Sequence, residues 1–246
     1  MIIKAFKLII HVLFLSGLLF WNIFSLQAQE QKINYIPINH ASFILQSAEL
    51  NIYVDPVGDL EQYRSFRAAD IILITHNHHD HLDTKIVEAV KKDGALIIGS
   101  EDVINELGFG FVIKNGESQH LGDIIVQSIP MYNLTKDRLK FHPKGKGNGY
   151  VITLQGKRIY ISGDTEDIPE MRQLKNIDYA FVCMNLPYTM SVEQAASAVL
   201  DFKPKVVIPY HYRGPDGFSD IVKFKKLVSQ EKSISVECVD WYDENK

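Results

Sequence analysis

Apolar residues recur along most of this chain in short runs, and few of them form the longer stripes typical of helical proteins. From Lys32 onward the runs are rich in Ile, Val and Tyr and alternate with turn signals, which predicts strands with helices between them. The connections between the first three runs are too short for a crossover helix, so antiparallel pairing is expected. These first strands are expected over residues 33–38, 42–46 and 51–54.

Helices are expected where apolar residues recur with helical spacing behind a capping residue. Asp83 is placed to cap a helix over 84–92, and Ser191 with Gln194 resembles a capping box for a helix that ends at Phe202. The pattern predicts one domain of the α/β or α+β class. The remaining elements are helices over 102–107 and 220–229 and strands over 69–75, 96–99, 111–113, 124–129, 150–154, 157–161, 179–184, 206–209 and 234–239.

The first residues have the layout of an export signal. Two lysines precede a nearly uncharged stretch over 8–26, and Ala28 offers a small residue for cleavage. We therefore expect a signal peptide over 1–28, one folded domain over 29–246, and a periplasmic or secreted protein. The alternative is a retained membrane anchor, because about 20 apolar residues can span a bilayer.

Charge and cysteine content narrow the range of partners. The 26 basic and 30 acidic residues give a formal net charge of −4. Loss of the two leader lysines would make the charge about −6, so nucleic acid is not expected as a main partner. Cys183 and Cys238 both lie in apolar runs, which favours two buried free thiols over a disulfide.

The segment His76-Asn77-His78-His79-Asp80-His81 carries the strongest chemical signal in the sequence. The strand expected over 69–75 ends directly before it, so its side chains leave the sheet from one loop. Imidazole and carboxylate groups are the ligands of zinc and related transition metals. One ion cannot easily take four ligands from so short a segment, and two ions are therefore expected. The four candidate ligands are His76, His78, Asp80 and His81. His79 is not counted as a ligand.

With these residues in view, the chain resembles the metallo-β-lactamase superfamily, whose fold is a four-layer αββα sandwich with metals at one edge. The superfamily landmarks appear in order as Asp55 after a strand, the histidine cluster, Asp164 in Ser162-Gly163-Asp164-Thr165, and His211 after Pro209-Tyr210. The resemblance covers essentially the whole chain after the leader, and it implies a set of ligands for two metals. His76 and His78 would hold the first metal, Asp80, His81 and His211 the second, and Asp164 would bridge them.

One landmark departs from the superfamily pattern. Where a histidine is usual, this chain has Asn133 in Pro130-Met131-Tyr132-Asn133. Because an amide is a weak ligand, two alternatives are open. Either His142 supplies the missing nitrogen, or the first metal site is loose and His142 contacts the substrate instead.

Three further segments resemble the branch of the superfamily that contains L-ascorbate-6-phosphate lactonase. They are His40-Ala41-Ser42-Phe43, Asp55-Pro56 and Gly149-Tyr150-Val151-Ile152. His40 is expected either to support a ligand or the substrate, or to be a satisfied structural histidine. Asp55 is expected to steady a ligand by hydrogen bonding.

The ligand set indicates hydrolysis at two divalent ions, zinc first, with manganese or iron as alternatives. A metal-bound hydroxide would attack a lactone, ester or amide bond. Asp80 and Asp164 would orient the water and the ions, and His142 is a candidate donor to the leaving group. Arg213, and a basic stretch between Lys136 and Lys146 that includes Lys144, could attract an anionic small-molecule substrate, although such a stretch can also be a solvated loop.

Two alternative functions stay open. The same hydroxide could hydrolyse a phosphodiester. A non-catalytic metal-binding or ligand-binding protein is the alternative from another class, and retention of Asp80, Asp164 and His211 favours catalysis over it. A di-iron redox role is disfavoured, because His78 stands where those relatives carry an acid.

Overall fold

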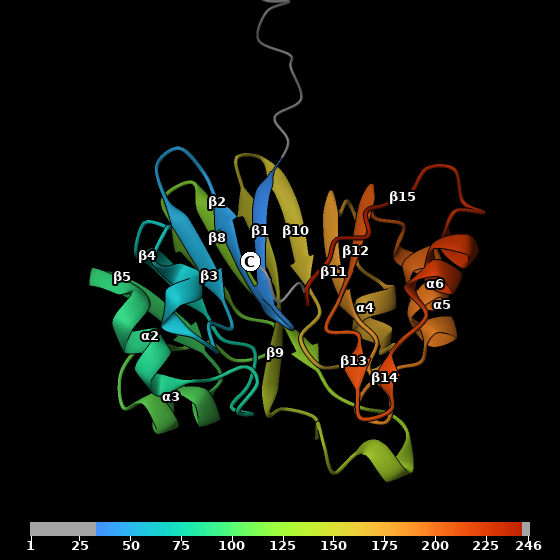
Figure 1. Cartoon of the computed structure of the whole chain (residues 1–246), viewed down its shortest axis with the longest axis horizontal. Coiled ribbons are helices and arrows are strands. Elements are labelled where there is room, and N and C mark those ends of the chain that lie inside the picture. Colours follow the sequence, from blue (N-terminus) through green and yellow to red (C-terminus); the bar gives the residue numbers. More distant parts are fainter. Residues whose placement is uncertain (1–32, 243–246) are drawn as a thin grey trace, which may run out of the picture. The chain divides into compact units, whose positions relative to one another are not determined.

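A computed structural model describes residues 33–242 of the chain. The expected signal peptide or anchor, residues 1–28, lies outside the described residues. Within the described range, no helix combines the length and the apolar character that crossing a membrane requires. Two β-sheets pack face to face in this part of the chain (Figure 1).

Six strands form the first sheet, in the order β1-β2-β3-β4-β5-β6. The first three pair antiparallel, as the short connections predicted. From β3 to β6 the neighbouring strands are parallel. The strands are β1 (Asn34–Asn39), β2 (Ser42–Gln46), β3 (Asn51–Val54), β4 (Ala69–Leu73), β5 (Lys91–Gly99) and β6 (Phe111–Val112).

Seven strands form the second sheet, in the order β15-β12-β11-β10-β9-β8-β7. The strands from β15 to β10 are parallel, and β9, β8 and β7 continue the sheet antiparallel. A separate hairpin joins β13 (Arg213–Gly214) to β14 (Gly217–Phe218). The strands of the sheet are β7 (Ser118–Leu121), β8 (Ile124–Met131), β9 (Gly147–Leu154), β10 (Lys157–Ile161), β11 (Tyr179–Cys183), β12 (Val206–Tyr210) and β15 (Ser235–Val236).

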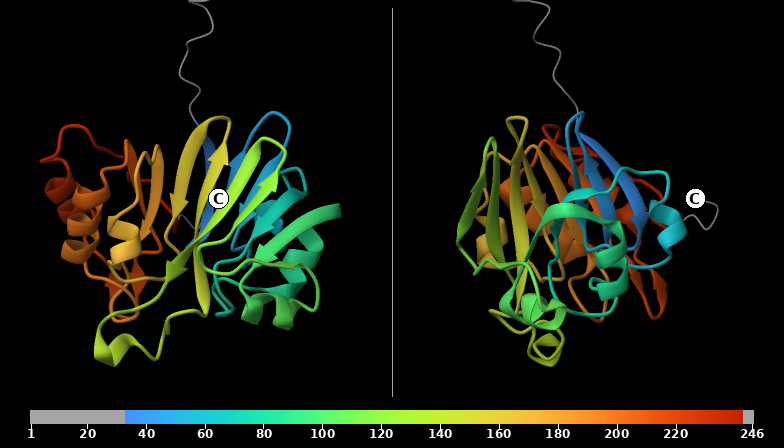
Figure 2. Two further views of the ribbon diagram at one scale, coloured as in Figure 1. Left: turned by 180° about the vertical axis from the view of Figure 1, so that it is seen from behind. Right: turned by 90° about the vertical axis from the view of Figure 1, so that its left-hand side faces the viewer.

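Helices cover the outer faces of both sheets, which gives the four-layer αββα sandwich (Figures 1 and 2). Beside the first sheet lie α2 (Thr84–Val90) and α3 (Glu101–Leu107). Beside the second lie α4 (Pro169–Arg172), α5 (Val192–Phe202) and α6 (Ile221–Val228). The 3₁₀ turns are η1 (Leu60–Tyr63) and η2 (Lys136–Arg138). The expected fold class is therefore confirmed.

Local capping chemistry sets the helix boundaries. The Asp83 side chain accepts hydrogen bonds from the backbone of Lys85 and Ile86, and Ser191 forms a capping box with Gln194. Helix α2 ends two residues earlier than expected, because Lys91 is already extended and pairs in β5.

An aromatic cluster joins the two sheets in the core. Phe43 of β2 stacks on Phe181 of β11 with ring centroids 4.3 Å apart, and both rings contact the fully buried Trp241. The Trp241 indole N–H donates to the carbonyl of Pro209 at 2.8 Å. Burying a large apolar side chain contributes about 1.5–3 kcal/mol, so this contact fixes the C-terminal segment to β12.

Several sequence expectations are wrong in detail. Cys183 is buried as expected, whereas Cys238 is exposed and lies outside any strand. The final strand is shorter than expected, and β7, β13 and β14 were not predicted. Strand β7 and the β13–β14 hairpin are largely exposed, so they lack the apolar pattern by which strands are recognised.

Asp178 links the starts of three neighbouring parallel strands. It precedes β11, accepts a hydrogen bond from the backbone N–H of Arg158 in β10 at 2.8 Å, and pairs with Lys205 before β12 at 2.9 Å. Burial alone would raise the pKa of this carboxyl, but the hydrogen bond from Arg158 and the charge of Lys205 together lower it. The ionised form therefore stabilises the fold.

We expect Asp178→Asn to lower the free energy of unfolding by about 1 kcal/mol at pH 7, measured by urea denaturation. Because the folded pKa is lowered, the contribution is present above about pH 4 and is lost as the pH falls through the lowered value. The exposed Asp93 is the matched control, and Asp93→Asn should change stability little. An equal loss in Asp178→Asn at all pH values would contradict a role for the charge.

Candidate metal centre

Several strands of each sheet share a direction, and those that lead to the candidate residues end at one edge of the sandwich. They are β1, β3 and β4 of the first sheet and β8, β10 and β12 of the second. The carboxyl ends of strands that share a direction lie at one edge, which is where α/β proteins place their sites. The residues that follow these ends include His40, Asp55, His76, Asn133, Asp164 and His211.

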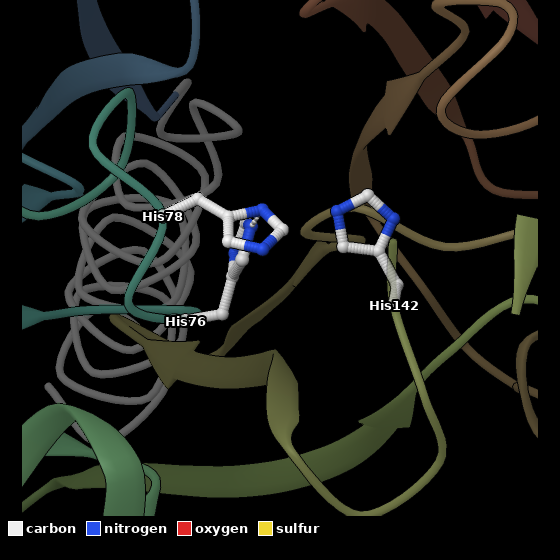
Figure 3. Close-up of side chains that lie close together, drawn as sticks. All are labelled: His76, His78 and His142. Atoms are coloured by element: carbon white, nitrogen blue, oxygen red, sulfur yellow. Dashed lines mark hydrogen bonds between the residues drawn. The ribbon is translucent and has the colours of Figure 1, made fainter. Parts of the chain in front are cut away.

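One cluster of imidazoles lies on the side of the loop after β8. His76 and His78 leave the loop after β4, and His142 reaches them from the loop before β9 (Figure 3). One ligand atom from each ring lies within 4.8 Å of the others. His76 Nε2 is 3.0 Å from His78 Nδ1. The structure therefore brings His142 to the two cluster histidines.

A second cluster joins the two sheets. His81 Nε2 and His211 Nε2 are 3.0 Å apart, and both approach Asp164 Oδ1, at 3.4 and 3.2 Å. Asp80 lies at the rim, with its Oδ2 3.6 Å from His211 Nε2 and about a third of its side chain exposed. The structure thus gathers all the ligands that the resemblance implied.

Asp164 lies between the two clusters. Its Oδ1 faces His81 and His211, while its Oδ2 is 3.3 Å from His142 Nε2. The preceding Gly163 has φ +59°, and a Cβ there would come within 2.5 Å of the Met131 sulfur. Glycine lets this turn lie against Met131 without strain, and the turn fixes where the carboxylate emerges.

The hydrogen bonds of the ring nitrogens leave lone pairs directed at the clusters. His81 Nδ1 is 2.7 Å from Asp55 Oδ2, so a proton lies on that nitrogen and Nε2 is the ring atom that faces the cluster. Thr75 Oγ1 donates to Asp55 and can therefore accept from His76 Nδ1 at 3.0 Å. Asp55, which also accepts from the Thr75 backbone at 2.7 Å, is placed to orient both rings.

The same reasoning applies to His142. Both N–H groups of the Asn133 amide are taken by carbonyls, of Arg138 at 3.0 Å and of Tyr188 at 2.7 Å. His142 Nδ1 therefore donates to the Tyr188 carbonyl at 3.2 Å. Its Nε2 faces Asp164 with a lone pair, which suits a ligand better than a proton donor. The amide nitrogen of Asn133 therefore contacts the loop and not a ring of the cluster other than His142.

This donor set fits divalent transition metals. Among the described residues, Asp164 Oδ1 and His142 Nε2 are buried without a hydrogen bond, and such atoms need a partner. Neutral imidazoles and carboxylates that converge in this way are the ligands zinc prefers. Burial lowers the pKa of His76 well below its usual value, which keeps that ring neutral. Burial also opposes charge on His81, but Asp164 and Asp55 outweigh burial and raise that pKa, so a metal that binds Nε2 would displace a proton from this ring.

A buried carboxylate that the sequence did not reveal holds the loop of His142. Glu166 accepts hydrogen bonds from the backbone of Leu134 and of Thr135, both at 2.5 Å, and from the Thr135 hydroxyl at 2.7 Å. It also pairs with Arg138 at 2.5 Å. Because its partners lie on a distant loop, no local pattern around Glu166 could have indicated this role.

The basic stretch is mostly engaged in ion pairs. Lys144 pairs with Glu170 at 3.1 Å and Lys146 with Asp102 at 2.9 Å. The Arg213 guanidinium lies over the Tyr242 ring at 4.8 Å. Lys144 and Arg213 are thus placed against other side chains and not in the clusters.

A cavity of about 260 Å³ adjoins the first cluster. It is lined by His76, His78 and His142 together with Lys140 and Lys146. The Lys140 ammonium lies over the Phe141 ring, 4.9 Å from its centroid. Lys140 therefore offers a positive charge beside the imidazoles.

Comparison with known proteins supports this interpretation. The model of the β-lactamase superfamily domain matches residues 32–211. A UPF0173 metal-dependent hydrolase of Pyrococcus abyssi is 31% identical over 215 residues, which covers 81% of this chain and 93% of the relative. A second one, from Ligilactobacillus salivarius, is 32% identical over 211 residues, covering 80% and 94%.

Solved structures give the same result. The crystal structure of a metal-dependent hydrolase from Parabacteroides distasonis has 43% identity and a TM-score of 0.77, covering 84% of this chain and 91% of that one. Igni18, a metallo hydrolase from Ignicoccus hospitalis, has 24% identity, a TM-score of 0.72 and coverage of 86% and 96%, a likeness of fold. None of these relatives is described as a lactonase, so membership of the lactonase branch stays a prediction.

We expect Asn133→Ala to weaken zinc binding by about 10–100-fold, because loss of the amide frees the loop that orients His142. Zinc titration with a competing chelator measures the affinity. His142→Ala should lower affinity further, and the exposed His120→Ala should leave it unchanged. Unaltered affinity in both Asn133→Ala and His142→Ala would contradict the assignment of His142 to the first cluster.

Proposed function

The chain belongs to the β-lactamase superfamily and is a metal-dependent hydrolase; on that premise we propose that it cleaves a lactone, ester or amide bond in an anionic small molecule. We propose two divalent ions, zinc first, held by His76, His78 and His142 on one side and by Asp80, His81 and His211 on the other. The observation that carries this proposal is Asp164, whose two oxygens face the two clusters separately.

Each residue has a task under this proposal. The bound ions would supply Lewis acidity, which polarises the scissile carbonyl and makes water a better nucleophile. Asp80, at the exposed rim, would orient the attacking water and bind a metal as a carboxylate. Burial would raise the pKa of Asp80, but the hydrogen bond from His40 and the charge of His81 lower it far more, so the carboxylate is ionised. Asp164, buried and fixed by its turn, orients the ligands on both sides.

Phosphodiester hydrolysis is the second candidate. The cavity beside His76 and His142 carries Lys140 and Lys146 on its wall. Positive charge beside a metal centre suits a phosphoryl group as well as a carboxylate. The lysines would attract either kind of anion. The choice between ester and phosphodiester hydrolysis therefore depends on the reacting group of the substrate.

The proposed pair of ions is tested by metal content and activity together. We expect about two zinc ions per chain in the purified protein and a clear loss in Asp164→Ala, because that variant removes the group shared by both clusters. Hydrolysis of a panel of lactones, carboxylic esters and phosphodiesters should fall in parallel. One ion or none, unchanged in Asp164→Ala and without turnover, would favour the non-catalytic binding protein.

The role of Lys140 is tested by substrate charge. We expect Lys140→Ala to raise KM for an anionic ester about 5–10-fold, since one exposed charge contributes about 1 kcal/mol. The kcat for that ester and the KM for a neutral ester should stay nearly unchanged. Lys136→Ala, a change on the same loop but outside the cavity lining, is the control. Equal effects on neutral and anionic esters would contradict charge recognition.

We also propose that the protein is exported. The support is the leader-like sequence over 1–28, with its two lysines, apolar stretch and Ala28. Amino-terminal sequencing of the protein from fractionated cells should find a chain that begins at Gln29. An intact amino terminus in the membrane fraction would favour the anchor instead.

A further inference from the structure

Tyr242, near the C-terminal end of the chain, is bound to the residues around the second cluster. Its hydroxyl oxygen lies 3.1 Å from the backbone nitrogens of Tyr212 and Arg213, the two residues that follow His211. It also lies 2.8 Å from His40 Nδ1. A phenol of the C-terminal segment thus connects the ends of β1 and β12.

The protons in this contact can be assigned. Backbone N–H groups only donate, so the Tyr242 oxygen accepts from both Tyr212 and Arg213. The phenol has one proton of its own, and His40 Nδ1 is the remaining partner. The phenol therefore donates to Nδ1, and in the neutral ring the proton of His40 lies on Nε2.

His40 touches two of the proposed ligands. Its Nε2 is 3.4 Å from Asp80 Oδ2, and its ring lies 3.8 Å from the His211 ring, centroid to centroid. The backbone N–H of His211 donates to the His40 carbonyl at 3.2 Å. Both residues have positive φ, +56° and +46°, which non-glycine residues adopt only where the surroundings hold them.

Geometry alone would allow another role for His40. One ligand atom from each of His40, Asp80 and His211 lies within 4.8 Å of the others, as a metal-binding triad requires. A metal, however, needs the lone pair of His40 Nε2. Tyr242 opposes that role, because donation to Nδ1 places the proton on Nε2.

We propose that Tyr242 is a positioning residue that holds His40 as an Nε2–H donor to Asp80, so that His40 orients the proposed ligands Asp80 and His211 without binding a metal itself. This inference rests on the proposed function for its effect on catalysis. The hydrogen-bond arrangement itself can be tested without any substrate.

The first test is the tautomer of His40. Long-range ¹H–¹⁵N spectra of the purified ¹⁵N-labelled chain, with and without zinc, distinguish a protonated from an unprotonated ring nitrogen. We expect the Nε2–H form of His40 in both states, identified by the signals that His40→Gln removes. A proton on Nδ1, or an Nε2 shift typical of zinc coordination, would overturn the proposal.

The second test separates positioning from ligation. His40→Gln keeps an N–H donor near the position of Nε2, so we expect the zinc content per chain to equal that of the parent. Tyr242→Phe keeps the ring beneath Arg213 and loses only the hydroxyl. We expect it to weaken zinc binding at the second cluster, which contains Asp80 and His211, about 10–100-fold and to lower kcat more than it changes KM. Loss of a zinc ion in His40→Gln, or unchanged zinc affinity in Tyr242→Phe, would refute the role.

Tyr35→Phe is the matched control for Tyr242→Phe. The Tyr35 hydroxyl donates to Glu237 at 2.7 Å, so it also fastens the C-terminal segment but does not touch His40. Thermal unfolding of both variants shows whether they fold. If Tyr35→Phe weakened zinc binding as much as Tyr242→Phe, anchoring of the segment would explain the effect and the proposal would fail. A parent chain that binds zinc but hydrolyses nothing would refute the proposed function and leave the tautomer test intact.

Discussion

The placement of one buried carboxylate between two groups of imidazoles organises the functional edge of this protein. Asp164 presents separate oxygens to His142 on one side and to His81 and His211 on the other. A buried carboxylate is costly unless charges or hydrogen bonds compensate it, and its nearest neighbours are imidazoles. Imidazoles from both sheets can surround Asp164 because strands of both sheets end at the edge where this carboxylate lies.

The structure maintains this arrangement with strained backbone and buried hydrogen bonds. His40, Asp55 and His211 all have positive φ, and each follows directly after a strand of the functional edge. Such conformations cost about 1–3 kcal/mol each and persist where surrounding contacts hold them. Asp55 receives two hydrogen bonds from Thr75 and contacts His81, so that its fixed carboxylate connects β3 to the histidine loop. Rigid supports of this kind keep the donor atoms in place with little reorganisation on binding.

The sequence was informative wherever the signal was local. Apolar runs located most strands, side-chain caps located α2 and α5, and the spacing of His76 to His81 indicated the metal-ligand segment. Prediction failed where the signal lay in a distant partner. Glu166 and Tyr242 look like ordinary polar residues until folding brings the loop at 134–138 and His40 against them. The exposed β7 has no apolar alternation, and the sequence could not show that the His142 ring lies beside His76 and His78.

The departure at Asn133 concerns which residue supplies a nitrogen to the first cluster. A metal site depends on where a lone pair lies in space, so another position of the same loop can supply it. Here the loop turns back and brings a ring nitrogen of His142 to His76 and His78. The Asn133 amide donates instead to the Arg138 and Tyr188 carbonyls, and we propose His142 as the ligand. With those donors fixed, the His142 tautomer follows from hydrogen-bond counting alone. Hydrogen-bond counting gives the opposite result for His40. Because Tyr242 donates to His40 Nδ1, the proton of that ring lies on Nε2, the nitrogen that faces the cluster. Both proposals therefore assign a histidine as ligand or support by the hydrogen-bond partner of its far nitrogen, because both His40 and His142 lie close enough to bind.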